Sequence, residues 1–168
     1  MGCLLSHLDP EDTRYDKKAQ QLREELELNK LENHPVYDEA RIKQLLDNGQ
    51  PLVLGLEFFY GAWNHRKMEE YKIGTRDMEA WDKGIVSTPN EKDIKLSREH
   101  GAGHSIVVVG YDDEKKVYYF KNSWGTEGFG IKSDLLGESG TTKGYGSITY
   151  EYAHNYGEFQ VVTLSRRR

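Results

Sequence analysis

The stretch from Gly101 to Gly130 constrains the fold of this chain more than any other part of the sequence. It contains two runs rich in β-branched and aromatic residues, 105–111 and 116–121, separated by a polar turn. This pattern predicts a β-hairpin. His104 stands at the head of the first strand and Asn122 directly follows the second, a layout that can hold an imidazole ring and orient it with an amide side chain.

Composition predicts a globular chain and excludes several classes of partner. The 168 residues suffice for one compact domain with a real core. Hydrophobic residues make up 36%, charged residues 30%, and the mean hydropathy is -0.80, which is typical of a polar globular chain. The sequence has no apolar run long enough for a bilayer and no signal segment, so we expect no membrane partner. The net charge of -5 gives no electrostatic basis for binding nucleic acid.

The single cysteine, Cys3, excludes an internal disulfide bond. A chain without disulfides is typical of a reducing compartment, so we expect a cytoplasmic location. No metal and no cofactor are expected, because the histidines other than His104 are scattered without metal-ligand spacing. These five are His7, His34, His65, His100 and His154.

Two helices are expected before the hairpin. Charged residues with a thin leucine stripe predict a surface helix over 16–32, which Pro35 ends. A better apolar face predicts a helix over 37–47, with Asp38 as its N-cap and Asn48-Gly49 as its end.

The remaining strands follow from short apolar runs. The run 51–59 predicts a buried strand, and 144–150 and 159–164 are two further candidate strands. Segment 60–100 is expected to be irregular, apart from a short helix near 67–71. Helices followed by an antiparallel sheet indicate an α+β fold.

Four motifs in this region resemble the C-terminal half of papain-like cysteine peptidases. They are Gly103-His104-Ser105, Val109-Gly110-Tyr111, Lys121-Asn122-Ser123-Trp124-Gly125 and Gly128-Phe129-Gly130. The similarity extends over roughly 42–164, and the closing segment resembles bacterial members of the family. It implies the family's right-hand lobe, an antiparallel half-barrel sheet with preceding helices. The expected domains are therefore a crossover-like lead-in with a polar helix, 1–35, and the C-terminal lobe, 36–168.

The resemblance also implies roles for individual residues. His104 would be the base that deprotonates a thiol, Asn122 would fix the imidazole ring, and Trp124 would shield their hydrogen bond from water. Gly103 and Ser123 would support the site. Independently of the family, a nearby imidazole can convert a thiol of ordinary pKa into a thiolate, and it can then protonate a leaving amine.

The nucleophile is the point at which the sequence departs from the family pattern. The family's Gln and its Cys-Gly-Ser-Cys-Trp signature are both missing from this sequence. Cys3 is the one candidate thiol, but it lies in Met-Gly-Cys-Leu-Leu-Ser, with Asp9-Pro10 interrupting any helix that would begin there. The start of the chain better resembles the family's crossover segment between the two lobes.

Three explanations remain open. The chain is one piece of a larger or two-chain peptidase, a stand-alone half that binds peptides without catalysis, or a truncated form. The expected partners are a peptide or protein substrate and either a Cys-bearing lobe or a second copy of this chain. An incomplete or degenerate peptidase, a pseudo-enzyme when alone, is favoured over a competent enzyme.

Two further features have alternative interpretations. The opening Met1-Gly2-Cys3-Leu4-Leu5-Ser6 also fits an N-myristoylation pattern with an adjacent cysteine for palmitate, although a start codon joined to a crossover segment is the preferred interpretation. The aromatic run 57–63 fits either a barrel core or the wall of a substrate subsite.

Overall fold

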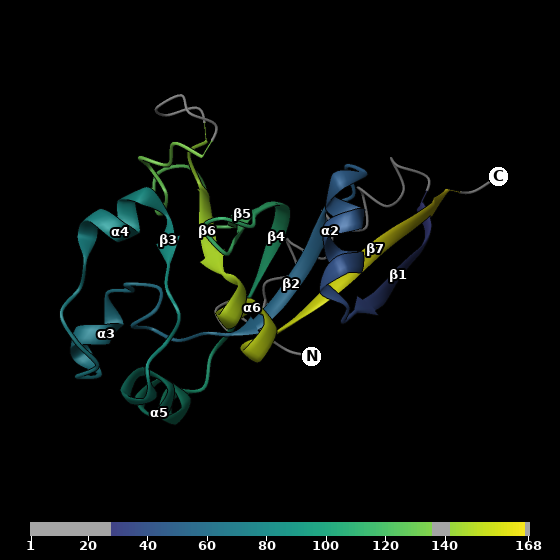
Figure 1. Ribbon diagram of the computed structural model, residues 1–168. Coiled ribbons are helices and arrows are strands. Elements are labelled where there is room, and N and C mark those ends of the chain that lie inside the picture. Colours follow the sequence, from purple (N-terminus) through teal and green to yellow (C-terminus); the bar gives the residue numbers. More distant parts are fainter. Residues whose placement is uncertain (1–27, 136–141, 167–168) are drawn as a thin grey trace.

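The structure is a computed structural model that describes residues 28–135 and 142–166. Its centre is a seven-stranded sheet in the order β1-β7-β2-β4-β5-β6-β3 (Figure 1). The strands are β1 (Leu28–Val36), β2 (Leu52–Glu57), β3 (Ile85–Val86), β4 (Gly103–Asp112), β5 (Val117–Lys121), β6 (Tyr145–Thr149) and β7 (Gly157–Arg166).

The sheet confirms the predicted α+β class. The hairpin of β4 and β5, the buried strand β2 and the late strands β6 and β7 all form where the sequence predicts strands. Neighbouring strands are antiparallel, with one exception that the sequence did not predict: Ile85 and Val86 of β3 pair in parallel with β6. The last strand, β7, lies between β1 and β2 and pairs with both.

Helices pack around this sheet. They are α2 (Glu39–Asp47), α3 (Lys67–Glu70), α4 (Met78–Lys83), α5 (Glu91–His100) and α6 (Tyr150–Tyr156). In Figure 1, α3, α4 and α5 lie toward one end of the sheet, whereas α2 packs against β4. The prediction of α2 is confirmed, including its cap, because an Asp38 carboxylate oxygen accepts a hydrogen bond from the Arg41 amide at 3.1 Å.

The expectation that 60–100 is irregular is wrong for α4 and α5, although the short helix α3 is confirmed. Both missed helices have clear caps. Asp77 accepts hydrogen bonds from two amides of the first turn of α4, and Gly84 ends that helix in the left-handed conformation. The Asn90 side chain caps α5 by accepting one hydrogen bond, from the Asp93 amide.

The helix expected over 16–32 is wrong for its last residues, because β1 begins at Leu28. Pairing with β7 along the whole strand overrides the helical preference of the charged composition. Pro35 is tolerated because β1 is an edge strand. Residues 16–27 lie outside the described part of the chain. The domain boundary at 35 stays a prediction, although β1 continues across it into the same sheet.

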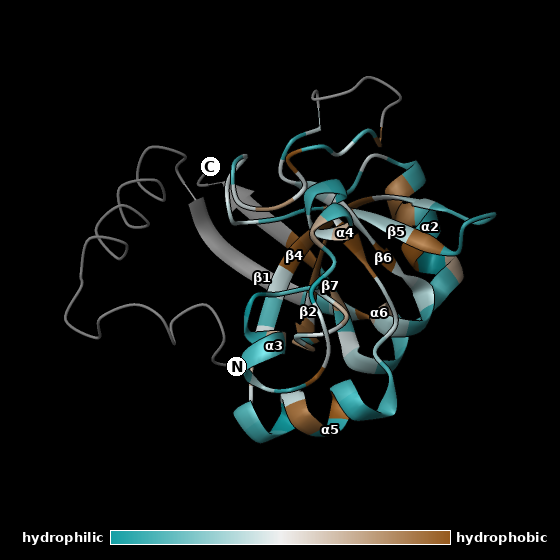
Figure 2. Cartoon of the chain, turned by 90° about the vertical axis from the view of Figure 1, so that its left-hand side faces the viewer, coloured by the Kyte–Doolittle hydropathy of each residue, from teal (hydrophilic) through white to brown (hydrophobic). Residues whose placement is uncertain are grey.

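The core lies between the sheet and the helices α2 and α6 and contains many aromatic side chains. Figure 2 shows hydrophobic colouring on central strands such as β4 and β6, whereas α2 and α5 carry both hydrophilic and hydrophobic colours. Alternate residues of β2 and β5 point inward, as expected for a half-buried sheet. The largest fully buried side chains are Trp63, Tyr118, Tyr152, Phe59, Phe120 and Phe129.

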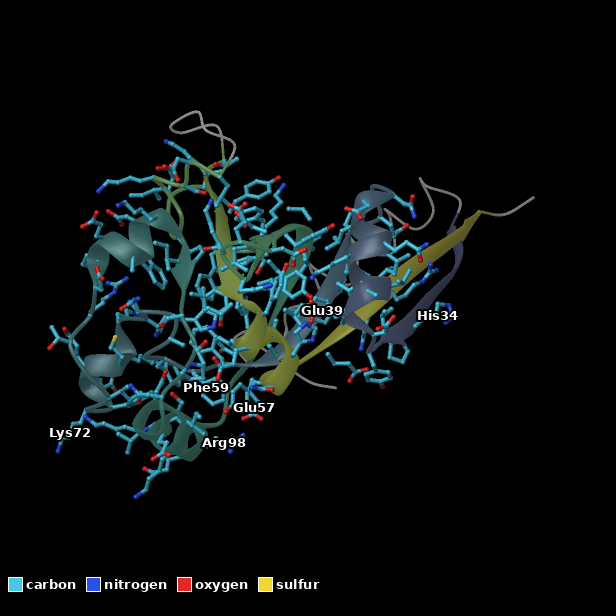
Figure 3. The ribbon with its side chains drawn as sticks, viewed as in Figure 1. His34, Glu39, Glu57, Phe59, Lys72 and Arg98 are labelled. Carbon is cyan, nitrogen blue, oxygen red and sulfur yellow. The ribbon has the colours of Figure 1, made fainter. Side chains whose placement is uncertain are left out.

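An exposed ion pair joins α5 to the end of β2. The Arg98 guanidinium contacts the Glu57 carboxylate through two hydrogen bonds, of 2.9 and 3.1 Å, and lies 5.9 Å from the ring of Phe59. Figure 3 labels these three residues close together. Within the described residues, no helix has the length and apolar character that a membrane span requires.

Candidate active site

The β4–β5 hairpin brings His104 and Asn122 together. His104 is the second residue of β4, and Asn122 directly follows β5. Since the two strands are antiparallel, both residues lie at the same end of the hairpin. The His104 Nε2 and Asn122 Oδ1 atoms are 2.8 Å apart, which is a hydrogen-bond distance. Both side chains are buried, with exposed fractions of 9% and 6%.

The backbone around Asn122 fixes the direction of its amide. The side-chain Oδ1 of Asn122 also accepts a hydrogen bond from the Ser123 backbone amide at 2.8 Å. The backbone amide of Asn122 donates to the Gly144 carbonyl at 2.9 Å. An oxygen can only accept, so the His104 Nε2 atom carries the proton in this pair. The neutral imidazole therefore keeps the lone pair of Nδ1 for another proton. Among the described residues, the buried Asn122 Nδ2 has no hydrogen-bond partner.

Aromatic rings enclose the imidazole. Trp124 stacks on His104 with ring centroids 4.6 Å apart and planes at 27°. Trp63 and Phe58 present their rings edge-on, at 5.3 and 6.0 Å. Burial among these rings lowers the pKa of His104, and the hydrogen bond to Asn122 opposes that shift only in part. The His104 imidazole is therefore neutral at pH 7.

Side chains of α5 hold the loop that carries two of these rings. The buried Asp93 carboxylate accepts hydrogen bonds from the amides of Gly61 and Ala62, at 2.9 and 2.6 Å, and from the Ser97 hydroxyl at 2.7 Å. Ser97 in turn accepts from the Tyr60 amide at 3.0 Å. A Cβ on Gly61 would lie 2.7 Å from the Asp93 carboxyl group, so only glycine allows this close approach.

The hydroxyl of Tyr152, on α6, joins the same loop to β2. It donates to the Glu57 carbonyl at 2.7 Å and accepts from the Phe59 amide and from the Trp63 indole, both at 3.1 Å. The Trp63 ring is thereby held at its polar edge, and the Phe58 ring stacks on it with centroids 5.2 Å apart. This anchoring supports the core interpretation of the aromatic run, because Phe58, Phe59 and Trp63 are all buried. Phe58 and Trp63 nevertheless also contact His104.

The other candidate site residues differ in whether they lie at the His104–Asn122 pair. Gly103 precedes His104 in β4 and pairs with Glu57 of β2. Ser123 is exposed and contributes its backbone amide to Asn122. Cys3, with the whole Met1–Ser6 segment, lies outside the described residues.

The sequence patterns do not mark Asp93, Tyr152 or Trp81 as residues that support the site. Asp93 and Ser97 are polar residues four apart on a helix, which is the one signal in the sequence that they share a face.

In the ranges 28–135 and 142–166, no group of three or more His, Cys, Asp or Glu side chains is arranged to hold a metal ion.

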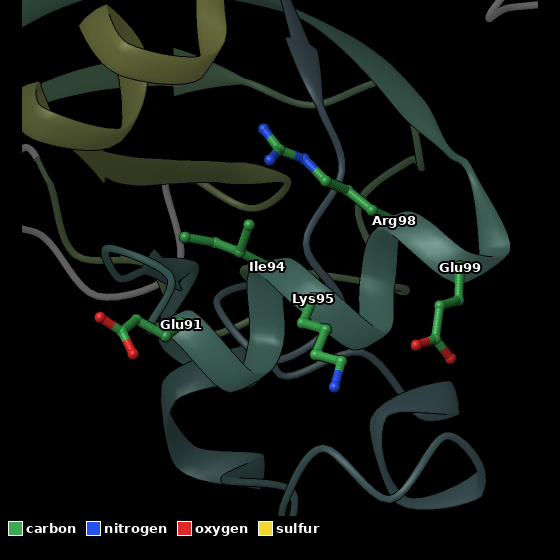
Figure 4. A pocket seen from close by; sticks show the side chains of 5 residues that line it. All are labelled: Glu91, Ile94, Lys95, Arg98 and Glu99. Atoms are coloured by element: carbon green, nitrogen blue, oxygen red, sulfur yellow. The ribbon is translucent and has the colours of Figure 1, made fainter.

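An open hollow on α5 is separate from the histidine site. Figure 4 shows its lining, which comes from a single helix and consists of Glu91, Ile94, Lys95, Arg98 and Glu99. Neither His104 nor Asn122 borders it.

A second histidine lies in a polar cluster away from the site. The His154 Nε2 atom, on α6, is 2.9 Å from the Tyr118 hydroxyl and 3.7 Å from the Glu39 carboxylate. Burial lowers the pKa of His154, and the Glu39 charge opposes this shift. The cluster includes Lys43, which bridges Glu39 and Asp113 at 2.6 Å each.

The hairpin thus holds a buried imidazole against an amide side chain, under the ring of a tryptophan. The chain belongs to the Peptidase_C39 like family, whose model matches residues 12–135. This membership confirms the expectation of a peptidase family. Among solved structures, the chain is similar to xylellain, a cysteine protease from Xylella fastidiosa, with 22% identity and a TM-score of 0.49. The alignment covers 80% of this chain and 40% of xylellain. A comparison with curated proteins found no match.

Proposed function

We propose that this chain carries the His–Asn half of a cysteine-peptidase site that cleaves peptide bonds by a thiol–imidazole mechanism. The observation that carries the proposal is the 2.8 Å contact between His104 Nε2 and Asn122 Oδ1 under the ring of Trp124. This contact leaves Nδ1 of a neutral imidazole as the proton acceptor. Family membership supports the same chemistry.

The residues would share the reaction as follows. His104 Nδ1 takes the proton of a thiol, and the thiolate attacks the carbonyl carbon of the peptide bond. The imidazolium then gives this proton to the leaving amine, and an acyl-thioester remains. A water molecule, deprotonated by His104, hydrolyses the thioester and regenerates the thiol. Asn122 keeps the ring oriented through these proton transfers without adding charge.

The thiol is the missing part of the proposal. Cys3 is the candidate within the chain, and a Cys-bearing lobe or a second copy of this chain is the candidate outside it. The exposed valines of β4 are a surface for a partner, although not one that faces the imidazole. Val107 and Val109, on the strand that carries His104, are 39% and 42% exposed. Because side chains alternate along a strand, these two valines lie on the opposite face of β4 from His104, so they offer an apolar surface to a partner but do not themselves bring a thiol to the imidazole.

The same apolar surface favours one alternative, a non-catalytic peptide- or protein-binding module derived from the peptidase fold. In that case the partner would be recognised by Val107, Val109 and their neighbours, and the imidazole would be dispensable. The substitution His104→Ala separates the two functions, since it would abolish cleavage but leave partner binding largely intact. The single cysteine supports a reducing, cytoplasmic setting for either function.

The experiment that tests the proposal is labelling of the full chain with a peptidyl epoxide, measured by intact mass. Stoichiometric labelling of Cys3 that disappears in His104→Ala would establish a complete site within one chain. Cys3→Ser is the control for labelling at other positions. If the folded chain is not labelled, the histidine half is inert alone, and the test is repeated with a Cys-bearing lobe added. A well-formed complex that neither labels nor cleaves would refute the peptidase function.

A further inference from the structure

The indole ring of Trp124 covers His104 from a loop that has little structure of its own. Residues 122–130 form no helix or strand, and Ser123 and Gly125 on either side of Trp124 are exposed. Trp124 itself is half-buried. A ring in this position needs support from elsewhere if it is to stay stacked on the imidazole.

That support comes from α4. The Trp81 ring stacks on the Trp124 ring with centroids 5.6 Å apart and planes at 20°. The Trp81 indole nitrogen also donates a hydrogen bond to the Gly128 carbonyl at 2.6 Å, which ties the far side of the same loop to α4. In addition, the Gly130 amide donates to the Trp81 carbonyl at 3.1 Å. One residue therefore contacts the loop through its ring, its indole N–H and its backbone.

The other surroundings of Trp81 hold it in place. The Arg76 guanidinium lies 4.6 Å from the Trp81 ring centroid and donates a hydrogen bond to the Asn64 carbonyl at 2.7 Å. A guanidinium over an indole at this distance is a cation–π contact. Phe129 meets the Trp81 ring edge-on at 5.1 Å. The contacts thus run from Arg76 through Trp81 and Trp124 to His104.

Close packing at the end of α4 fixes its position relative to the loop. Gly84 ends α4 with a φ of +74°, and Gly130 ends the loop with a φ of +64°. A Cβ at either position would overlap the Tyr145 carbonyl of β6. The end of the helix, the end of the loop and the strand therefore meet backbone to backbone, which leaves little freedom for Trp81 to move away.

We infer that Trp81 is a positioning residue for His104, acting through Trp124. The inference rests on the proposed function, because positioning has meaning only if His104 is the base. Trp81 keeps the Trp124 ring over the imidazole and so maintains the water-poor environment of the His104–Asn122 pair. His65 is another titratable ring on this side, 6.0 Å from Trp81 and 6.4 Å from Trp124.

The test is an NMR titration of the His104 ring protons in the full chain, with His104→Gln used for assignment. This readout needs no peptidase activity, so failure of the proposed function would not affect it. In Trp81→Ala, water gains access to the imidazole, and the His104 midpoint should rise by about 0.5 pH unit or more. Trp81→Phe keeps a stacking ring and should restore most of the original midpoint. Met78→Ala, on the exposed side of the same helix, should leave it unchanged.

A purely structural role for Trp81 would lower the melting temperature without moving the His104 midpoint, and that result would overturn the inference. An equal shift in Met78→Ala would overturn it as well. If Trp81→Ala does not fold, Trp81→Leu replaces it, with the same expected rise. A further measurement requires no variant. Cross-relaxation between ring protons of Trp81 and Trp124 should be seen in the unmodified chain, and its absence would overturn the inference.

Discussion

Removal of the Asp93 carboxylate should release the loop that packs two aromatic rings against His104. Asp93 is 2% exposed and accepts three hydrogen bonds, from the amides of Gly61 and Ala62 and from the Ser97 hydroxyl. The substitution Asp93→Ala leaves these three donors facing an apolar methyl group. Nothing else in the described surroundings replaces the lost acceptor, because the loop has no strand partner at this point.

The expected magnitude follows from these contacts. A buried donor left without a partner costs about 1–3 kcal/mol. Two of the three donors are well buried, and Gly61 is half-buried, so water can partly satisfy its amide. We therefore expect Asp93→Ala to lower the free energy of unfolding by about 3–5 kcal/mol, a large part of the total for a domain of this size. Asp93→Asn retains one oxygen acceptor and should cost about 1–2 kcal/mol.

Urea unfolding followed by circular dichroism measures this loss, with Glu99→Ala as the matched control. Glu99 is an exposed carboxylate on the same helix, and its removal should change stability by less than about 0.5 kcal/mol. Amide hydrogen exchange should locate the effect, with faster exchange at Gly61 and Ala62. A loss below about 1 kcal/mol in Asp93→Ala, or unchanged exchange at these two amides, would refute the assignment of Asp93 as the anchor of the loop.

Three further results are expected. Tyr152→Phe should lower stability by about 2–4 kcal/mol in urea unfolding, because its hydroxyl makes three internal hydrogen bonds; a loss below about 1 kcal/mol would contradict this. Gly130→Ala should cost about 3 kcal/mol or more, whereas Gly101→Ala, also at positive φ but with open space around it, should cost about 1 kcal/mol, and equal losses would count against the steric argument. Burial lowers the pKa of His104, so the unfolded chain binds its proton more readily and stability should fall as the pH drops below about 6.5. His104→Gln should weaken this pH dependence of stability and leave the contribution of His154. A stability–pH curve unchanged by the substitution would disprove the contribution of His104.

The His–Asn pair and the strands around it could be predicted because the information is local. The hairpin has β-branched runs on both sides of a polar turn, and His104 and Asn122 stand at its open end. The contact of Trp81 with Trp124 could not be predicted in this way. It depends on how the six-residue helix α4 packs against a loop more than forty residues later, and no spacing rule expresses that.

Two differences between the predicted and the observed secondary structure have physical causes. The strand β1 has the charged composition of a surface helix, and only its pairing with the distant strand β7 decides the outcome. Helix α5 was missed because its buried positions include Asp93 and Ser97, so its inner face is partly polar and leaves no continuous apolar stripe. The Asp93 carboxylate and the Ser97 hydroxyl, which would normally mark a solvated face, instead bind the loop.

The position of β7 between β1 and β2 has a consequence for biosynthesis. A ribosome produces β1 and β2 long before β7, so these two early strands wait without the neighbour that joins them. Until β7 emerges, β2 can pair only with β4, and β1 has no partner within the described sheet. A nascent chain with such open strand edges is exposed to wrong pairing, which makes completion of the last strand the step that commits this chain to its native topology.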